Sequence, residues 1–332
     1  MSPTALLTGA AGFIGSHLCE ALVHAGYRLR AFVRYNSRGE PGFLGCLPGE
    51  IQSEIELVAG DITDSGAVQG AVRGCDTVFH LAALISIPYS YRCPRAVVAA
   101  NLSGTLNLLE ACRAEGVRRL LLTSTSEVYG SAQSVPISEA HPLQAQSPYA
   151  ASKIGADKLA ESYYCAYGLP VVIVRPFNTY GPRQSARAVI PALIAQALTQ
   201  DVVQIGANTR RDFTYVSDSV AGFLAAAGAR GVEGQVFNLG AGDEVWIHSL
   251  AETILALCQP FRPAGAAAPR LAIDAARLRP EKSEVQRLIS DNRKARQALG
   301  WQPKIDLETG LRHTIAWIAA HPRLFRPAEY AF

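Results

Sequence analysis

The sequence has little excess charge of either sign. Its 31 lysine and arginine residues are nearly balanced by 28 acidic residues, which leaves a formal net charge of +3. Proteins that bind nucleic acid usually present a strongly basic surface, because neutralising the backbone phosphates supplies much of the affinity. We therefore expect no nucleic-acid partner.

Other patterns are missing as well. The seven cysteines include no C-x-x-C pair, so neither a zinc site nor a disulfide framework is predicted. No apolar run reaches the length of a membrane-spanning helix, and no internal repeat is visible. The first predicted strand begins close to Met1 and leaves no room for a signal peptide. We expect a soluble, cytoplasmic protein with reduced thiols and with neither a bound metal nor a membrane contact.

Short apolar segments alternate with longer amphipathic segments over the first half of the chain. The amphipathic segments, such as 14–25 and 101–115, are predicted helices. The apolar segments are predicted strands, at 5–8, 29–33, 55–59, 77–81, 119–123 and 170–174. Continuous apolar strands separated by helices are typical of a parallel sheet that is buried on both faces. With right-handed crossovers, this pattern predicts an α/β fold built on a doubly wound parallel (Rossmann) sheet.

The composition changes after Pro176. Residues 178–187 are rich in glycine, proline and arginine, and residues 259–269, rich in proline, alanine and glycine, are a predicted loop. We expect residues 1–176 to form a dinucleotide-binding domain. Residues 177–332 would form mainly a smaller, discontinuous C-terminal substrate lobe, part of which returns to the Rossmann sheet.

A glycine-rich loop joins the first predicted strand to the first predicted helix. Gly9, Gly12 and Gly15 would permit a tight turn and let a pyrophosphate approach the backbone, while Phe13 and Ile14 begin the helix. The amide groups of the helix N-terminus would then bind the phosphates. Because a strand precedes the glycines and a helix follows them, we predict a nicotinamide dinucleotide site and not an ordinary turn.

The end of the second predicted strand lacks an acidic residue. Enzymes that use NAD place an acid about twenty residues after the glycine loop, where it binds the adenosine ribose. This chain has Arg34 and Arg38 there, and both could bind a 2′-phosphate through charge-assisted hydrogen bonds. Solvated loop arginines would look the same in the sequence. We favour NADP over NAD.

A tyrosine and a lysine share one face of a later predicted helix. Ser147 is the predicted N-cap, and the four-residue spacing places Tyr149 and Lys153 on the same side. A nearby ammonium group would favour the phenolate and lower the tyrosine pKa. Tyr149 could then accept a hydroxyl proton during hydride transfer. Such pairs occur by chance on many helices, but this one follows a matching glycine loop.

Together these motifs resemble the extended short-chain dehydrogenases/reductases, over residues 6 to about 317. The fifth predicted strand is followed by Thr125, Ser126 and Glu127, which is similar to the nucleotide-sugar 4,6-dehydratases. GDP-mannose 4,6-dehydratase has Thr-Ser-Glu at this place, dTDP-glucose 4,6-dehydratase has Thr-Asp-Glu, and sugar 4-epimerases usually lack the glutamate. With segments 82–91 and 177–191, the chain is similar to the NAD(P)-dependent 4,6-dehydratases of legionaminic-acid and related amino-sugar pathways.

The resemblance implies a reaction. Tyr149 and Lys153 would support oxidation at C4, Glu127 would remove the C5 proton that the ketone has made acidic as water leaves C6, and the hydride would return to C6. Ser126 stands where the dTDP-glucose enzymes have an acid. The group that protonates the leaving O6 is therefore left open between Glu127, a bound water and a serine relay. The implied substrate is UDP- or GDP-linked N-acetylglucosamine.

The resemblance also implies further contacts. Around the cofactor these are Asp61, Ile62, Leu81, Ala82 and Ala83. For the substrate they are Ile87, Asn178, Arg187, Val189, Arg211, Arg279 and Glu284, of which the asparagine and the last two arginines would bind the diphosphate. Extended members commonly pair through two helices, here 101–115 and 149–167, so a homodimer with a four-helix interface is expected. The outer faces would carry Leu102, Leu106, Leu109, Leu159 and Tyr163, which core packing explains equally well.

Other functions remain open at this point. A UDP-sugar 4-epimerase or a UDP-glucuronate decarboxylase would use the same oxidation by Tyr149 and Lys153. Neither needs a base at C5, so Glu127 argues against both, and a decarboxylase also needs a cation near the C6 carboxylate. A non-catalytic dinucleotide-sensing regulator is a remote alternative, because such proteins often lose the tyrosine or the lysine.

Overall fold

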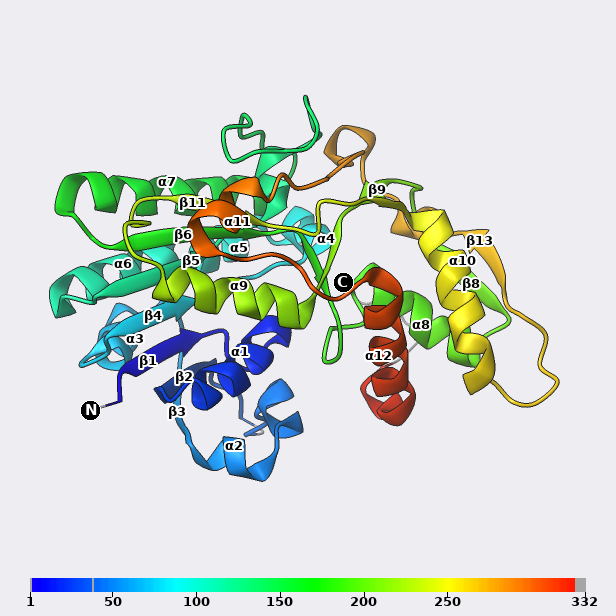
Figure 1. Cartoon of the computed structure of the whole chain (residues 1–332), viewed down its shortest axis with the longest axis horizontal. Coiled ribbons are helices and arrows are strands. Elements are labelled where there is room, and N and C mark those ends of the chain that lie inside the picture. The colour runs from blue at the N-terminus through cyan, green and yellow to red at the C-terminus, as the bar shows by residue number, and fades with distance from the viewer. Residues whose placement is uncertain (1, 38, 326–332) are drawn as a thin grey trace.

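The computed structural model describes residues 2–37 and 39–325, and its centre is a seven-stranded sheet in the order β11-β6-β5-β4-β1-β2-β3 (Figure 1). All neighbouring strands in it are parallel. The strands are β1 (Thr4–Thr8), β2 (Arg28–Arg34), β3 (Ile55–Gly60), β4 (Thr77–His80), β5 (Arg119–Thr123), β6 (Val171–Pro176) and β11 (Val236–Leu239). The predicted doubly wound α/β fold is confirmed.

The strand order changes direction between β1 and β4. The chain runs outward through β2 and β3, returns to β4 on the other side of β1, and continues through β5 and β6. In doubly wound sheets, ligands bind at the carboxyl ends of the strands at this switch point. The segments that leave those ends begin at Gly9, Leu81, Ser124 and Phe177, so the predicted site residues converge there.

Helices cover both faces of the sheet because the strands are apolar on both sides. On one face α1 (Phe13–His24), α9 (Val216–Gly228) and α11 (Arg293–Leu299) contribute to one buried core. On the other face α3 (Ser65–Val72), α6 (Gly104–Glu115) and α7 (Pro148–Tyr167) contribute to a second. Figure 1 shows α6 and α7 on one side of the sheet and α1 and α9 on the other. Shorter helices lie in the loops after β2 and β4: α2 (Gly49–Ser53), α4 (Ile87–Arg92) and α5 (Pro94–Val98).

A smaller group of elements lies at one end of the molecule (Figure 1). It contains α8 (Val189–Thr199), α10 (Ile247–Cys258), α12 (Leu307–Ala320) and the parallel pair β8 (Val202–Ile205) and β13 (Arg270–Ile273), around a core of its own. Two short strand pairs complete this half of the chain: β7 (Asn178–Tyr180) with β10 (Phe213–Tyr215), and β9 (Arg210–Arg211) with β12 (Val245–Trp246). Between these elements the chain returns to the large sheet through α9 and β11.

No helix within residues 2–37 and 39–325 combines the length and the apolar character that crossing a bilayer needs.

Candidate active site

The loop after β1 and the start of α1 carry glycines at positions where a side chain would not fit. Gly9 has φ +73°, and a Cβ there would lie 2.8 Å from the backbone nitrogen of Ala82. A Cβ on Gly15 would lie 2.2 Å from the Gly9 carbonyl oxygen. Gly12 is the N-cap of α1 and offers no side chain to the amides of the first turn. Those amides and the helix dipole suit an anion such as a pyrophosphate, so the loop fits a dinucleotide.

A buried histidine fixes β4 beside that loop. His80 contacts Thr8 Oγ1 through Nδ1 at 2.8 Å and Thr105 Oγ1 through Nε2 at 3.0 Å. Burial lowers the pKa of His80 to about 3, so the ring is neutral near pH 7. The same Thr8 hydroxyl accepts hydrogen bonds from the backbone nitrogens of Leu81 and Ala82, at 3.2 and 3.1 Å. The segment predicted to lie against the cofactor, 81–83, is thus held next to the glycine loop, where Phe13 and Ile14 pack partly buried against the core.

The ends of β2 and β3 would meet the adenosine half of a dinucleotide. Asp61 accepts hydrogen bonds from the backbone nitrogen and the hydroxyl of Thr63 at 2.9 and 2.7 Å, and these bonds lower its pKa. Arg34 is exposed at the end of β2, and its charge lowers the pKa of Asp61 a little further. Ile62 is buried. Arg38, the second arginine considered for a 2′-phosphate, lies outside the described residues.

The catalytic helix begins as the sequence predicts. The Ser147 hydroxyl caps α7 by accepting a hydrogen bond from the Ala150 nitrogen at 3.1 Å, and Pro148 occupies the first turn. Tyr149 and Lys153 follow on this helix and are both buried. The Lys153 amine contacts the Thr123 carbonyl, which places this face of the helix at the carboxyl end of β5.

The charges around these two residues differ from the expectation. Burial raises the pKa of Tyr149, a hydrogen bond with Thr125 opposes that rise, and the Glu127 carboxylate adds to it. The amine of Lys153 donates to the Thr123 carbonyl at 2.6 Å, and burial lowers its pKa to about 8. The prediction that the ammonium group lowers the tyrosine pKa is therefore wrong for this structure, because desolvation dominates.

A buried ion pair behind the lysine was not found from the sequence. The Asp157 carboxylate accepts hydrogen bonds from Arg175 at 2.9 and 3.0 Å and from the Ser124 hydroxyl at 2.8 Å. Its charge raises the pKa of Lys153, against the effect of burial. Asp157 lies one helical turn beyond Lys153, so the spacing that identified the lysine would also have identified this residue.

Asn101 was missed as well. Its side chain accepts a hydrogen bond from the Leu84 nitrogen at 2.7 Å and donates to the Leu84 carbonyl and to the Ser152 hydroxyl, both at 3.0 Å. It thereby ties the loop after β4 to the catalytic helix. No sequence motif marks this asparagine, because it lies at the start of a predicted helix where polar residues are common.

The predicted base leaves β5 in a short turn. Thr125 is the N-cap of the 3-10 turn Ser126–Tyr129, and its hydroxyl accepts a hydrogen bond from the Glu127 nitrogen at 3.2 Å. Ser126 is buried, and the Glu127 side chain keeps 14% of its surface exposed. The carboxylate therefore faces a partly open site beside Tyr149.

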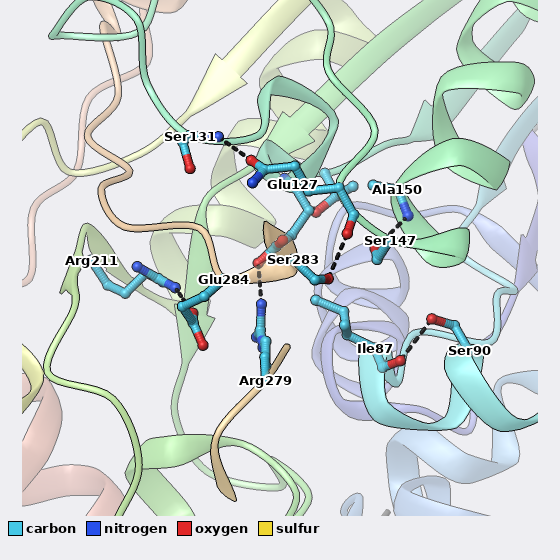
Figure 2. Close-up of polar contacts among 12 residues, drawn as sticks. Ile87, Ser90, Glu127, Ser131, Ser147, Ala150, Arg211, Arg279, Ser283 and Glu284 are labelled. Carbon is cyan, nitrogen blue, oxygen red and sulfur yellow. Dashed lines mark hydrogen bonds and ion pairs between the residues drawn. The ribbon is translucent and has the colours of Figure 1, made fainter. Parts of the chain in front are cut away.

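Two arginines and two glutamates form a cluster over this site (Figure 2). Arg279 Nη1 lies 3.6 Å from Glu127 Oε1, and Arg211 Nη2 lies 3.2 Å from Glu284 Oε1. The Arg211 side chain is almost fully buried, which lowers its pKa, while the nearby Glu127 and Glu284 carboxylates oppose that shift. Segments far apart in the sequence thus place two guanidinium groups, suited to phosphate oxygens, next to the base.

The other predicted substrate residues differ in their burial and in their hydrogen-bond partners. Ile87 is buried at the start of α4, and Val189 begins α8 partly buried. The Asn178 amide, predicted to bind a diphosphate, donates one hydrogen bond to the Asp212 carbonyl at 3.0 Å. Arg187 is exposed, and its Nε donates to the Ser185 hydroxyl at 3.3 Å.

Asp212 is a structural anchor that the sequence did not reveal. Its buried carboxylate accepts hydrogen bonds from the backbone nitrogens of Ala241, Gly242 and Ser290, at 2.8 to 2.9 Å. Burial raises its pKa to about 6, and these hydrogen bonds oppose the rise. Because it directly follows Arg211, it fixes the strand that carries that arginine.

Residues 6–314 match the family model described as GDP-mannose 4,6 dehydratase. The chain belongs to this family. The resemblance stated from the sequence is thereby confirmed, and the protein is an enzyme of the extended short-chain dehydrogenase/reductase type.

Relatives of this family member carry two kinds of names. A dTDP-glucose 4,6-dehydratase from Actinoplanes sp. is 35% identical over 323 residues, which cover 95% of this chain and 98% of the relative. A UDP-glucose 4-epimerase from Mycolicibacterium smegmatis is 35% identical over 321 residues, covering 93% and 96%. The solved structure of a dTDP-glucose 4,6-dehydratase from Streptomyces venezuelae with NAD and TYD bound aligns with TM-score 0.86 and 30% identity, covering 98% and 100%. The family therefore includes both dehydratases and epimerases.

Proposed function

We propose that the protein is a nucleotide-sugar 4,6-dehydratase. The observation that carries this proposal is the Glu127 carboxylate, which lies beside the buried Tyr149 at the carboxyl end of β5. A bound nicotinamide dinucleotide would accept a hydride from C4 of the sugar and later return it to C6. Tyr149, as the phenolate, would accept the C4 hydroxyl proton, and Lys153 would support it from the same helix face. Glu127 removes the C5 proton while the C6 oxygen leaves as water, and a proton returns to C5 when C6 is reduced.

The second candidate is a 4-epimerase, because a relative of equal identity carries that name. Epimerisation would use Tyr149 and Lys153 in the same way, but it would leave a carboxylate at position 127 without a task. UDP-glucuronate decarboxylation is a weaker candidate. The Glu127 carboxylate would repel the carboxylate of that substrate, although Arg279 is near enough to offset part of the repulsion.

The substrate proposed from the resemblance is UDP- or GDP-N-acetylglucosamine, in amino-sugar biosynthesis. Arg211 and Arg279 support the diphosphate part of this proposal, since both guanidinium groups project into the site (Figure 2). The sugar and the base rest on the resemblance alone, and so does the group that protonates O6. Ser126 is buried at the position of that acid.

The test is incubation of the purified protein with its cofactor and UDP- or GDP-N-acetylglucosamine in deuterated water, with dTDP-glucose and UDP-glucose in parallel. We expect the product to have lost one water and to carry deuterium at C5. Mass spectrometry measures the first change, and NMR measures the second. A product of unchanged mass with an inverted C4 centre would make the protein an epimerase. Loss of carbon dioxide from UDP-glucuronate would make it a decarboxylase.

We also propose that NADP is preferred over NAD. The exposed Arg34 stands where an acid would bind the ribose hydroxyls of NAD, although several related structures contain NAD. Removing a charge-assisted hydrogen bond to a phosphate weakens the binding free energy by about 1.5–3 kcal/mol. We therefore expect Arg34→Gln to raise the dissociation constant of NADP at least tenfold and to leave that of NAD within twofold, measured by fluorescence titration. Equal effects on both dinucleotides would contradict the preference.

Finally, we propose a homodimer through α6 and α7. Of the residues predicted to face outward, Leu109 and Tyr163 are buried within the protomer and belong to its core, and Leu159 packs against that core. The proposal rests instead on Leu106 and Tyr167, whose exposed fractions are 39% and 58%. A cytoplasmic location stays a prediction from the sequence.

A further inference from the structure

The arginine closest to the proposed base lies on a segment with little structure of its own. Arg279 precedes the 3-10 turn Glu281–Ser283, and Glu284 follows it. A single 3-10 turn is not stable by itself. Beyond this turn the chain is anchored at Val285, which is buried in a small core with Val128 and Tyr129. Hydrogen bonds to a neighbouring loop also hold the turn over the site.

Gln146 provides that connection, and it lies directly before the catalytic helix. Its side-chain nitrogen donates to the Lys282 carbonyl at 3.0 Å, and its own carbonyl accepts a hydrogen bond from the Ser283 hydroxyl at 2.5 Å. Its side-chain oxygen accepts a hydrogen bond from the Ser131 nitrogen, which fixes the side chain itself. Figure 2 shows Ser131 and Ser283 with their hydrogen bonds drawn as dashed lines.

A second element extends the connection. The Tyr91 hydroxyl, at the end of α4, lies 2.6 Å from the Ser283 hydroxyl. The turn is thus held both to the start of the catalytic helix and to the helix that carries Ile87. We call the contacts of Gln146 with Lys282 and Ser283 the clasp.

We propose that Gln146 is a positioning residue for the substrate: through the clasp it holds Arg279 where the diphosphate of a nucleotide sugar binds, beside Glu127. This inference rests on the proposed function. Gln146 lies on the loop before Tyr149, so the clasp sets the distance between the phosphate-binding segment and the catalytic helix. The diphosphate and the sugar carbon to be oxidised would therefore be placed relative to each other through one residue.

The test uses Gln146→Glu, Gln146→Ala and the control Gln144→Ala in the cofactor-loaded enzyme. A glutamate keeps the acceptor for the Ser131 nitrogen but turns an oxygen toward the Lys282 carbonyl, so it breaks the side-chain half of the clasp and leaves the contact of Ser283 with the backbone carbonyl. Gln144 lies exposed on the same loop, and its side chain takes part in no hydrogen bond that the structure describes. Ser283→Ala removes the other half of the clasp and serves if a Gln146 variant folds poorly.

We expect both Gln146 variants to raise the KM for the nucleotide sugar about five- to tenfold, the loss of roughly one net hydrogen bond. The kcat and the dinucleotide dissociation constant should stay within twofold of the control. Calorimetry with UDP, GDP and dTDP should give the same rise in the dissociation constant of whichever diphosphate binds.

The possible outcomes separate the clasp from the proposed function. If the wild type turns over no nucleotide sugar but the variants still bind nucleoside diphosphates more weakly, only the dehydratase proposal fails. Equal KM and binding in the Gln146 and Gln144 variants would overturn the clasp, as would a parallel fall in kcat and dinucleotide affinity. A wild type that binds no nucleoside diphosphate would overturn both.

Discussion

At the scale of single residues, the site combines a buried acid–base pair with a partly open carboxylate. Tyr149 and Lys153 are shielded from water, and their pKa values move in opposite directions, up for the phenol and down to about 8 for the amine. Burial disfavours the charged form of each, so both shifts have one cause. Glu127 keeps contact with solvent and with Arg279, so its carboxylate is open to a substrate.

Glu127→Gln tests the chemistry of that carboxylate. The amide has nearly the same shape but cannot accept the C5 proton, so we expect water loss to fall by about 10²–10⁴ and deuterium at C5 to disappear. Binding of nucleoside diphosphates should persist, because Arg211 and Arg279 are unchanged. Mass spectrometry and NMR measure the first effects, and calorimetry measures the last. Retained dehydration in this variant would show that another group is the base.

At the scale of secondary structure elements, the carboxyl ends of the strands are held together by buried polar contacts. The Thr8–His80–Thr105 chain joins β1, β4 and α6, and it includes a histidine that stays neutral because burial lowers its pKa to about 3. An unfolded chain would protonate this histidine below about pH 6.5. The folded form does so only near pH 3, so protons bind preferentially to the unfolded state between these values.

The variant His80→Gln tests whether protonation of this histidine makes the stability of the protein depend on pH. As the pH falls from 6.5 toward 4, the unfolding free energy of the wild type should decrease relative to the variant by about 1.4 kcal/mol per pH unit. Chemical denaturation at several pH values measures the difference. Above pH 7 the wild type should be more stable, because the variant cannot reproduce both hydrogen bonds. If the unfolding free energies of the two proteins changed in parallel with pH, the lowered pKa of His80 would be contradicted.

These elements also indicate where sequence reasoning succeeded. The strands, the glycine loop and the cap of α7 depend on local patterns, and each lies within two residues of its prediction. The Asp212 anchor and the Asn101 tie depend on contacts between residues distant in the chain, which no local pattern encodes. The tyrosine pKa was predicted wrongly for a related reason, because the degree of burial is a property of the assembled fold.

At the scale of the whole molecule, one exposed face belongs to the two helices that the dimer proposal invokes. Leu106 on α6 and Tyr167 on α7 are apolar or aromatic and open to solvent. A charge at each of these two positions should remove the favourable free energy of burying the side chains in a dimer interface. We expect sedimentation velocity to find a dimer for the wild type and a monomer for Leu106→Glu/Tyr167→Glu with unchanged circular dichroism. A monomeric wild type would contradict the proposal.

The position of β11 has a consequence for how the protein is made. This strand covers the outer side of β6, yet about sixty residues, which include α8 and α9, separate the two in the chain. A ribosome that has released the first six strands has therefore exposed the unpaired backbone of β6, an edge that invites pairing with other chains. Folding of the nucleotide-binding half must wait for residue 239 to emerge. A gene fragment that ends at residue 176 should accordingly aggregate when it is expressed alone.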